Sequence, residues 1–208
     1  MEPVIKILSA STELFRQHGF KVTTMDDIAR RAGISKKTLY QHFSNKNEIV
    51  IESVSWYKDK ISGMCQAAMS QSANAIEGMV RTMDMFDQIH RQINPNALME
   101  LERYYPDGYE KFKEKLMGED VERIKDNILQ GIAEGNYRAD VNPEFMARYR
   151  MELSLMIFHP NLLVNERHDM HVVGHEIAEH YLYGIMTPKG EKLYQKYKEK
   201  YLKKVTTI

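Results

Sequence analysis

The sequence predicts an all-α protein, and three observations carry that prediction. Apolar residues recur at three-and-four spacing through most of the chain, which is typical of amphipathic helices. No stretch of useful length alternates apolar and polar residues as a half-buried strand would. Clusters of glycine, proline and asparagine separate the periodic stretches and mark helix ends. We therefore expect two helical domains, residues 1–46 and residues 47–208.

The composition is that of an ordinary globular protein. Of the 208 residues, 43% are hydrophobic and 28% are charged, which excludes a disordered chain. A single cysteine, Cys65, excludes an internal disulfide framework and is typical of a reducing cytosol. No run approaches the length of an apolar membrane span, and the N-terminus lacks a signal-peptide core, so we expect a cytoplasmic protein without membrane contact.

The charges balance over the whole chain but not along it. The 29 basic and 29 acidic residues give a net charge of zero. Residues 21–46, however, hold six basic and two acidic residues, so this stretch is positive and the remainder is mildly acidic. A basic head on an acidic body is the charge distribution expected of a DNA reader with a separate regulatory part.

The first helix is expected over residues 3–20. Pro3 is tolerated in a first helical turn, and Gly19 can end the helix. This helix is expected to close a small core with Phe20, Val22, Ile28, Leu39 and Phe43.

Two short helices follow, joined by a tight turn. Thr24 is a good N-cap, and Asp27 three positions later can complete a capping box. Gly33 can adopt the left-handed conformation that ends the second helix, and Ser35 caps the third helix almost at once. Because so short a turn makes two helices cross steeply, the pattern predicts a helix-turn-helix.

The third helix is expected to have a buried and an exposed side. Leu39 and Phe43 are four positions apart on one stripe, whereas Lys37 and Gln41 point the opposite way. The remaining polar side chains lie on the flanks or at the helix start: Lys36, Thr38, Tyr40 and His42. Such side chains suit a DNA major groove, because they reach phosphates and base edges. Taken alone, the same face is also that of an ordinary solvated helical hairpin.

A longer pattern includes these helices. It reads Leu14-Phe15-x-x-x-Gly19-Phe20, then Thr23-Thr24-Met25-x-x-Ile28-Ala29-x-x-Ala32-Gly33-Ile34-Ser35-Lys36-x-Thr38-Leu39-Tyr40-x-His42-Phe43-x-x-Lys46. This pattern resembles the DNA-binding domain of TetR-family transcriptional regulators over about residues 7–51. The resemblance implies an all-helical homodimer with a variable C-terminal ligand domain. Lys37 departs from the family, in which many members carry a small residue or proline, and it adds a positive charge.

The resemblance and the exposed face together give a set of DNA-binding residues. Those expected to meet bases or adjacent phosphates are Ser35, Lys36, Lys37, Thr38 and Gln41. Those expected to hold the DNA backbone are Thr24, Tyr40, His42 and Lys46. The resemblance assigns Lys46 to a phosphate at the start of a fourth helix, which is expected to run past Trp56 towards Ala68. The expected partner is double-stranded DNA with a near-palindromic operator.

The rest of the chain predicts further helices separated by turn signals. Their expected ranges are 75–93, 98–104, 109–134, 143–158, 169–185 and 191–204, with Gly118 as a point of interruption. The expected breaks include Pro106-Asp107-Gly108, His159-Pro160-Asn161 and Thr187-Pro188-Lys189-Gly190. The resemblance implies a homodimer through helices at about 143–158 and 170–185, and an intramolecular helix pair remains the alternative.

The chain is rich in methionine, and several methionines lie on helices that enclose the ligand pocket in the resembled family. Flexible thioethers line adaptable apolar pockets, although they also fill ordinary cores. The candidate residues for an unidentified small effector are Met64, Met83, Phe86, Tyr104, Tyr105 and Phe112. We therefore expect a transcriptional regulator of the repressor kind. A small and largely apolar ligand is expected to release it from DNA.

Histidines gather near the C-terminus, and they support the rival hypothesis of a metal-binding or enzymatic helical protein. They are His159, His168, His171, His175 and His180. His171 and His175 are four positions apart, a spacing that can hold a metal, but no His-Glu-x-x-His motif is present. We expect instead polar rim positions of a dimer interface or a pH-sensitive contact. No catalytic motif or cofactor fingerprint is found, so we expect neither an enzyme nor a cofactor. A body that binds a protein and not a small ligand is a third hypothesis.

Overall fold

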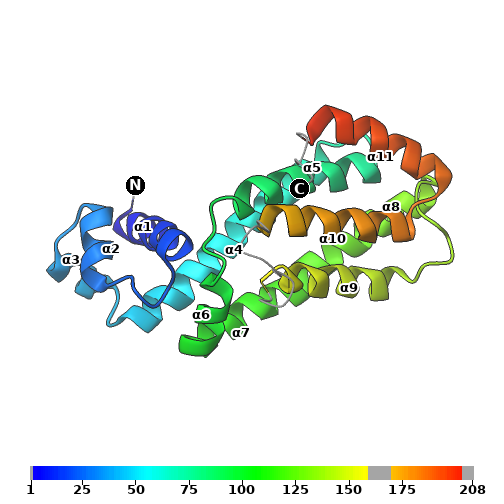
Figure 1. Ribbon diagram of the computed structural model, residues 1–208. Helices are drawn as coiled ribbons and strands as arrows, with labels where there is room; N and C mark the ends of the chain where they lie inside the picture. The colour runs from blue at the N-terminus through cyan, green and yellow to red at the C-terminus, as the bar shows by residue number, and fades with distance from the viewer. Residues whose placement is uncertain (1, 159–169, 203–208) are drawn as a thin grey trace. The chain divides into compact units, whose positions relative to one another are not determined.

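The computed structural model describes residues 2–158 and 170–202 (Figure 1). This part of the chain is helical and contains no strand, only an isolated antiparallel bridge between Tyr137 and Met186. The predicted all-α fold class is confirmed. The expected break at His159-Pro160-Asn161 lies outside the described residues.

The described residues fall into two compact units. The head unit comprises Met1–Ile61 and Gln92–Lys115, and the body unit comprises Ser62–Arg91 and Leu116–Ile208. This division differs from the expected boundary after residue 46, which stays a prediction about functional domains. The compact head is larger because Ala97 and Leu101 are buried in the same apolar cluster as the N-terminal helices.

The head unit begins with the helices that the sequence predicts. They are α1 (Pro3–His18), α2 (Met25–Ala32), α3 (Lys36–His42) and the first part of α4 (Lys46–Ser70). Their apolar core is formed by Ile7, Phe15, Ile28, Leu39 and Phe43, all nearly or fully buried. The core role expected for Val22 is wrong, because its side chain is 63% exposed. Val22 lies in the turn between α1 and α2, where helical spacing no longer dictates the direction of a side chain.

Two further helices complete the head unit, α6 (Ala97–Tyr104) and α7 (Pro106–Lys115). The turn expected at Pro106-Asp107-Gly108 is wrong, because these residues form the first turn of α7. Proline has no backbone N–H and a fixed φ, so it suits the first position of a helix as well as a turn. The expected break after Ile185 is confirmed at Met186 and Thr187, but it is shorter than expected, because Pro188 already opens α11 (Pro188–Tyr201) behind the N-cap Thr187.

The body unit contains α5 (Ala75–His90), α8 (Val121–Ala133), α9 (Pro143–Met156), α10 (Met170–Ile185) and α11. A π-helical turn, Leu116–Asp120, joins α7 to α8 and includes Gly118, where an interruption was expected. Helix α5 packs against both α10 and α11, and α8 packs against α9. The colours in Figure 1 follow this order along the chain.

Tyr137 anchors the turn between α8 and α9. Its side chain is 1% exposed, and its hydroxyl donates to Asn127 Oδ1 at 3.1 Å. Asn127 Nδ2 in turn donates to the carbonyl of Ala75 at 3.0 Å. The ring lies directly against Gly131, where a Cβ would come within 2.0 Å of it. This buried network ties three segments of the body unit together.

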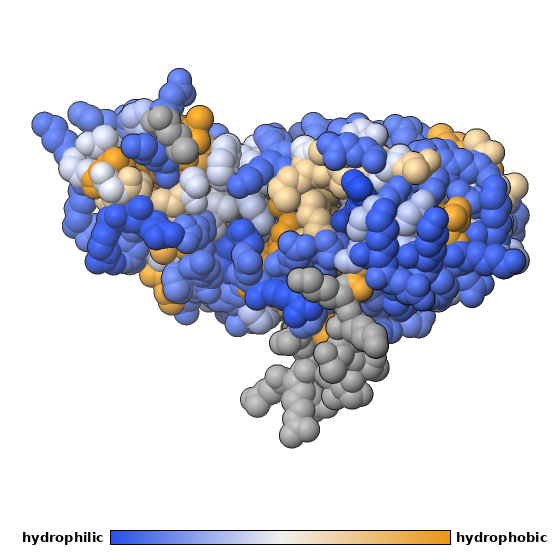
Figure 2. All heavy atoms as spheres, turned by 90° about the horizontal axis from the view of Figure 1, so that it is seen from above, coloured by the Kyte–Doolittle hydropathy of each residue, from blue (hydrophilic) through white to orange (hydrophobic). Residues whose placement is uncertain are grey.

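The face drawn in Figure 2 is mostly hydrophilic, with apolar residues in patches. Within residues 2–158 and 170–202, no helix is long and apolar enough to cross a membrane.

Candidate nucleic-acid interface

The start of α2 is fixed by a complete capping box. Thr24 Oγ1 accepts from the backbone N–H of Asp27 at 3.1 Å, and the Thr24 N–H donates to Asp27 Oδ2 at 3.0 Å. The Thr24 hydroxyl also donates to Asp27 Oδ2 at 2.6 Å. These hydrogen bonds from Thr24 lower the pKa of the Asp27 carboxyl. The expected cap is therefore present, and the Thr24 hydroxyl is already engaged within the chain.

The turn between α2 and α3 is made by Gly33 and Ser35. Gly33 has φ 67° and ψ 37°, the left-handed conformation that favours glycine. Ile34 N donates to the carbonyl of Ala29 at 3.0 Å, which closes the end of α2. Ser35 Oγ then accepts from Thr38 N at 3.0 Å and lies 2.8 Å from Thr38 Oγ1. The two side chains of Ser35 and Thr38 are thus used to start α3.

Helix α3 has the two sides that its sequence predicts. Leu39 is fully buried and Phe43 nearly so, whereas Tyr40 is 52% exposed. The other exposed side chains are Lys36, Lys37, Gln41 and His42. Lys36 Nζ lies 2.5 Å from Asp26 Oδ2, in an ion pair on the surface. Within the described residues, Lys37 and Gln41 make no side-chain hydrogen bond or ion pair, so both are available to an external partner.

Lys46 is partly buried at the start of α4. Its Nζ donates to the carbonyl of Phe20 at 2.5 Å and to that of Lys21 at 3.4 Å, and it lies 5.4 Å from the centre of the Tyr105 ring. The side chain therefore holds the loop between α1 and α2. An ammonium has three donors, so a phosphate contact by Lys46 stays a prediction.

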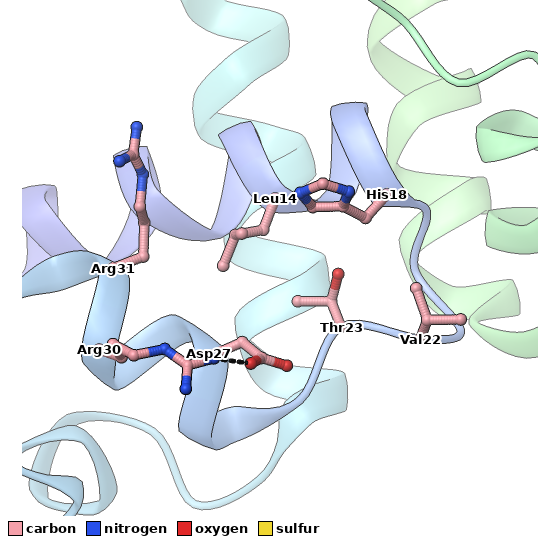
Figure 3. Close-up of a pocket in the computed structure, with 7 residues that line it drawn as sticks. All are labelled: Leu14, His18, Val22, Thr23, Asp27, Arg30 and Arg31. Atoms are coloured by element: carbon pink, nitrogen blue, oxygen red, sulfur yellow. Dashed lines mark hydrogen bonds and ion pairs between the residues drawn. The ribbon is translucent and has the colours of Figure 1, made fainter.

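A groove between α1 and α2 was missed by the sequence reasoning (Figure 3). Leu14 and His18 lie on its α1 side, and Asp27, Arg30 and Arg31 lie on its α2 side. Arg30 pairs with Asp27, and Arg31 pairs with Glu13. The hydrogen bonds to Glu13 raise the pKa of Arg31. The only sequence signal for this groove was the local excess of positive charge, because side-chain pairing between two helices leaves no local pattern.

The residues expected to bind a ligand do not gather in one unit. Met64, Met83 and Phe86 belong to the body unit, and Tyr104, Tyr105 and Phe112 belong to the head unit. Met83 is buried, Met64 and Tyr104 are exposed, and Tyr105 and Phe112 pack against the head core. Their shared role in a pocket stays a prediction.

The expected rim position is wrong for His171 and His175, because both are covered by their own chain and are less than a tenth exposed. Burial lowers the pKa of His175, which lies 3.8 Å from Glu179 Oε2. His180 is exposed, and its Nδ1 lies 2.8 Å from the carbonyl of Glu176. Among the residues described, no group of three or more potential ligands could hold a metal ion, while His159 and His168 lie outside that part.

A capped helix pair that presents a polar, partly basic α3, followed by a helical body, defines a helix-turn-helix DNA-binding protein. Residues 7–52 match the model of the bacterial regulatory proteins of the tetR family. This N-terminal domain belongs to the TetR family, and the chain is similar to TetR-family transcriptional regulators.

Two curated proteins and one solved structure illustrate the similarity. The transcriptional repressor KstR2 of Mycolicibacterium smegmatis is 24% identical over 153 residues, which cover 69% of this chain and 72% of that protein. The transcriptional activator FasR of the same organism is 40% identical over 70 residues, which cover 33% and 32%. The regulator FadR of Bacillus subtilis, solved with stearoyl-CoA, has a TM-score of 0.67 at 17% identity and covers 87% of this chain and 98% of that one. The similarity to FadR shows a shared fold alone.

Proposed function

We propose that this regulator is a homodimeric repressor that reads a near-palindromic operator with α3 and leaves it when a small, largely apolar molecule binds the body. The observation that carries the proposal is the exposed face of α3. Lys37 and Gln41 have no partner there among the described residues, and capped helix ends hold the backbone beneath them. A rigid helix with unengaged polar side chains is what major-groove readout needs.

The proposed DNA contacts differ according to whether each side chain already has a partner within the protein. Lys37 and Gln41 read base edges, and Lys36 reaches a base or phosphate once it leaves Asp26. Tyr40 and His42, both exposed, hold the DNA backbone. Ser35, Thr38 and Thr24 contribute chiefly through the caps of α2 and α3, and a phosphate contact by any of them uses an O–H or N–H donor, because a DNA phosphate only accepts hydrogen bonds. Lys46 adds a phosphate contact with its remaining donor.

Repression is the proposed direction of regulation. The relative that matches over most of its length, KstR2, is a repressor, whereas the activator FasR matches over about a third. A DNA target also implies the cytoplasm of a bacterial cell.

Dimerisation is proposed through α9 and α10. On α9, the large side chains of Phe145, Tyr149 and Met156 are 63%, 45% and 43% exposed. Phe145 and Tyr149 stack with ring centres 6.1 Å apart. Tyr183 on α10 is 42% exposed, while Tyr181, Leu182 and Ile185 are buried within the chain and are unavailable to a partner. An exposed aromatic stripe of this kind supports an interface.

An effector in the body is supported by two facts. FadR, which shares the fold, binds stearoyl-CoA. In this chain Met83 and Phe86 lie one turn apart on α5 in the body unit, and such apolar side chains suit an adaptable site.

The test combines gel filtration of the full chain with footprinting on DNA from its own promoter at several salt concentrations. The expected result is a dimer that protects a near-palindromic site with a steep salt dependence. A monomer, or a dimer that binds all DNA sequences alike, would overturn the proposal.

A further inference from the structure

Arg150 is a cation of the body unit that has no anionic partner among the described residues. It lies on α9, is partly buried, and has its Cζ 5.7 Å from the centre of the Tyr181 ring on α10. Among the described residues, no carboxylate lies within ion-pairing distance of its guanidinium. Buried charges are normally paired, because removing an unpaired ion from water is unfavourable.

Arg148, two residues earlier on the same helix, shows the ordinary arrangement. Its side chain is 57% exposed, and its Nε donates to Glu144 Oε1 at 2.8 Å. Arg148 is thus solvated and paired, whereas Arg150 is partly buried and has no ion-pair partner in the part of the chain that the structure describes.

Two groups near Arg150, Tyr181 and His90, are uncharged at neutral pH. Burial lowers the pKa of Arg150, and Tyr181 and Cys65 interact electrostatically with it. The Tyr181 hydroxyl donates to the carbonyl of Met146 at 3.2 Å, and burial raises its pKa, so it stays protonated. Burial, and then Arg150, lower the pKa of His90 to about 4, so its imidazole stays neutral. Asp87, which acts electrostatically on His90, pairs through Oδ2 with Arg91 at 3.1 Å and not with Arg150. Within the described part of the chain, the guanidinium of Arg150 is therefore not paired with a carboxylate.

Aromatic side chains pack around His90, on which Arg150 acts electrostatically. Phe86 and His90 stack with ring centres 5.9 Å apart, and Phe158 meets the edge of His90 at 6.4 Å. Helix α10 approaches α5 closely at Gly174, where a Cβ would lie 3.0 Å from His90 Nδ1. The residues near Arg150 thus come from α5, α9 and α10, and α10 packs against both other helices in the body unit (Figure 1).

We propose that Arg150 binds the carboxylate of a singly charged, otherwise apolar effector. A guanidinium offers a planar pair of N–H donors that matches a carboxylate, and a single negative charge balances that of Arg150. The aromatic rings of Phe86, His90 and Phe158 contact the apolar part of the effector. This inference rests on the proposed function in one respect, namely that the body binds a small molecule.

The experiment compares matched probes on the full-length protein by calorimetry. The probes are decanoate and hexadecanoate, the uncharged alcohols of the same chain lengths, and hexadecanoyl-CoA, which carries several negative charges. The variants are Arg150→Gln, Arg150→Lys and, as a control on the same helix, Arg148→Gln. Thermal unfolding of each variant checks that it folds.

The wild type is expected to bind at least one of the acids at least about tenfold more tightly than its alcohol, because a charge-assisted hydrogen bond is lost with the carboxylate. Arg150→Gln is expected to abolish this preference, Arg150→Lys to keep part of it, and Arg148→Gln to leave it unchanged. Equal binding of acid and alcohol, an unchanged preference in Arg150→Gln, or no binding of either acid would overturn the proposal. Arg150-dependent binding of the CoA thioester alone would overturn the singly charged carboxylate.

DNA release is measured separately, so that the two proposals can fail independently. Arg150-dependent binding that leaves a protein–DNA complex intact would contradict the release mechanism and support the Arg150 site. Release of DNA by the acids and the alcohols alike would support the regulator and contradict the role of Arg150.

Discussion

Glu100 on α6 accepts a hydrogen bond at 2.9 Å from the backbone N–H of Lys21, in the loop that connects α1 to α2. The same carboxylate covers Gly19, where a Cβ would lie 2.5 Å from Glu100 Oε2. Lys46 Nζ holds the carbonyls of Phe20 and Lys21 in this loop. A helix far along the chain thereby fixes the entry into the helix-turn-helix.

Replacing Glu100 by alanine is expected to loosen this loop. The Lys21 N–H would lose its protein partner, so the free energy of unfolding should fall by about 1 kcal/mol. DNA affinity should fall several-fold, because α2 and α3 are less well positioned. Urea unfolding and DNA titration measure the two effects. Glu102→Ala, an exposed change on the same helix, is the control, and an equal loss in both variants would contradict the role of Glu100.

Replacing Lys37 or Gln41 by alanine is expected to alter operator preference without altering stability. Neither side chain has a partner among the described residues, so unfolding should change by less than about 0.5 kcal/mol. Loss of a base contact should cost about 1–3 kcal/mol at particular base pairs. Binding to a library of single-base operator variants measures this. A loss that is uniform over all operators would mean that the residue contacts phosphate only.

Replacing Lys46 by alanine is expected to weaken binding to all operators alike. A lost phosphate contact should also flatten the dependence of affinity on salt by roughly one contact. Titrations between low and physiological salt measure this slope. If affinity falls while the slope stays that of the wild type, Lys46 acts through the loop carbonyls that it binds and not through DNA.

Replacing Gly131 by alanine is expected to destabilise the body unit by at least about 1–3 kcal/mol. The new Cβ would fall within 2.0 Å of the Tyr137 ring, which cannot move because it is buried and hydrogen-bonded to Asn127. Gly63→Ala, where nothing lies within 4 Å of a Cβ, is the control and should be neutral or stabilising. Thermal unfolding separates the two, and a stable Gly131→Ala protein would refute the contact.

Acidification is expected to destabilise the protein in part through His90. Its pKa is about 4 in the folded chain and near 6.5 when unfolded, so between these values the unfolded chain binds a proton that the folded chain does not. Stability from this group is therefore lost as the pH falls below about 6.5, by about 2 kcal/mol at pH 5. His90→Asn should show a smaller loss between pH 7 and pH 5 than the wild type. The exposed His18→Asn serves as the control, and equal losses in all three proteins would contradict the prediction.

The helix-turn-helix could be predicted closely because its signals are local. Thr24, Asp27, Gly33 and Ser35 act on backbone groups within three or four residues of themselves, so their roles can be inferred from spacing alone. The same reasoning misplaced Val22, because a turn has no period to dictate which side chains face inward.

The features that could not be predicted from the sequence depend on contacts between distant segments of the chain. Pro106 and Pro188 are each compatible with both a turn and the first position of a helix. Tertiary packing determines that both residues begin a helix. The burial of His171 and His175 and the inclusion of α6 in the head unit likewise arise from tertiary packing. No local pattern in the sequence indicated that Arg150 would have no ion-pair partner within residues 2–158 and 170–202.

The internal use of Ser35 and Thr38 has an evolutionary consequence. These two side chains are committed to starting α3, so substitutions there disturb the scaffold as well as the surface. The side chains of Lys37 and Gln41 take no part in this capping. A lineage can therefore drift to a new operator by mutating these two positions while each intermediate still folds, which makes α3 an easily retargeted part of the molecule.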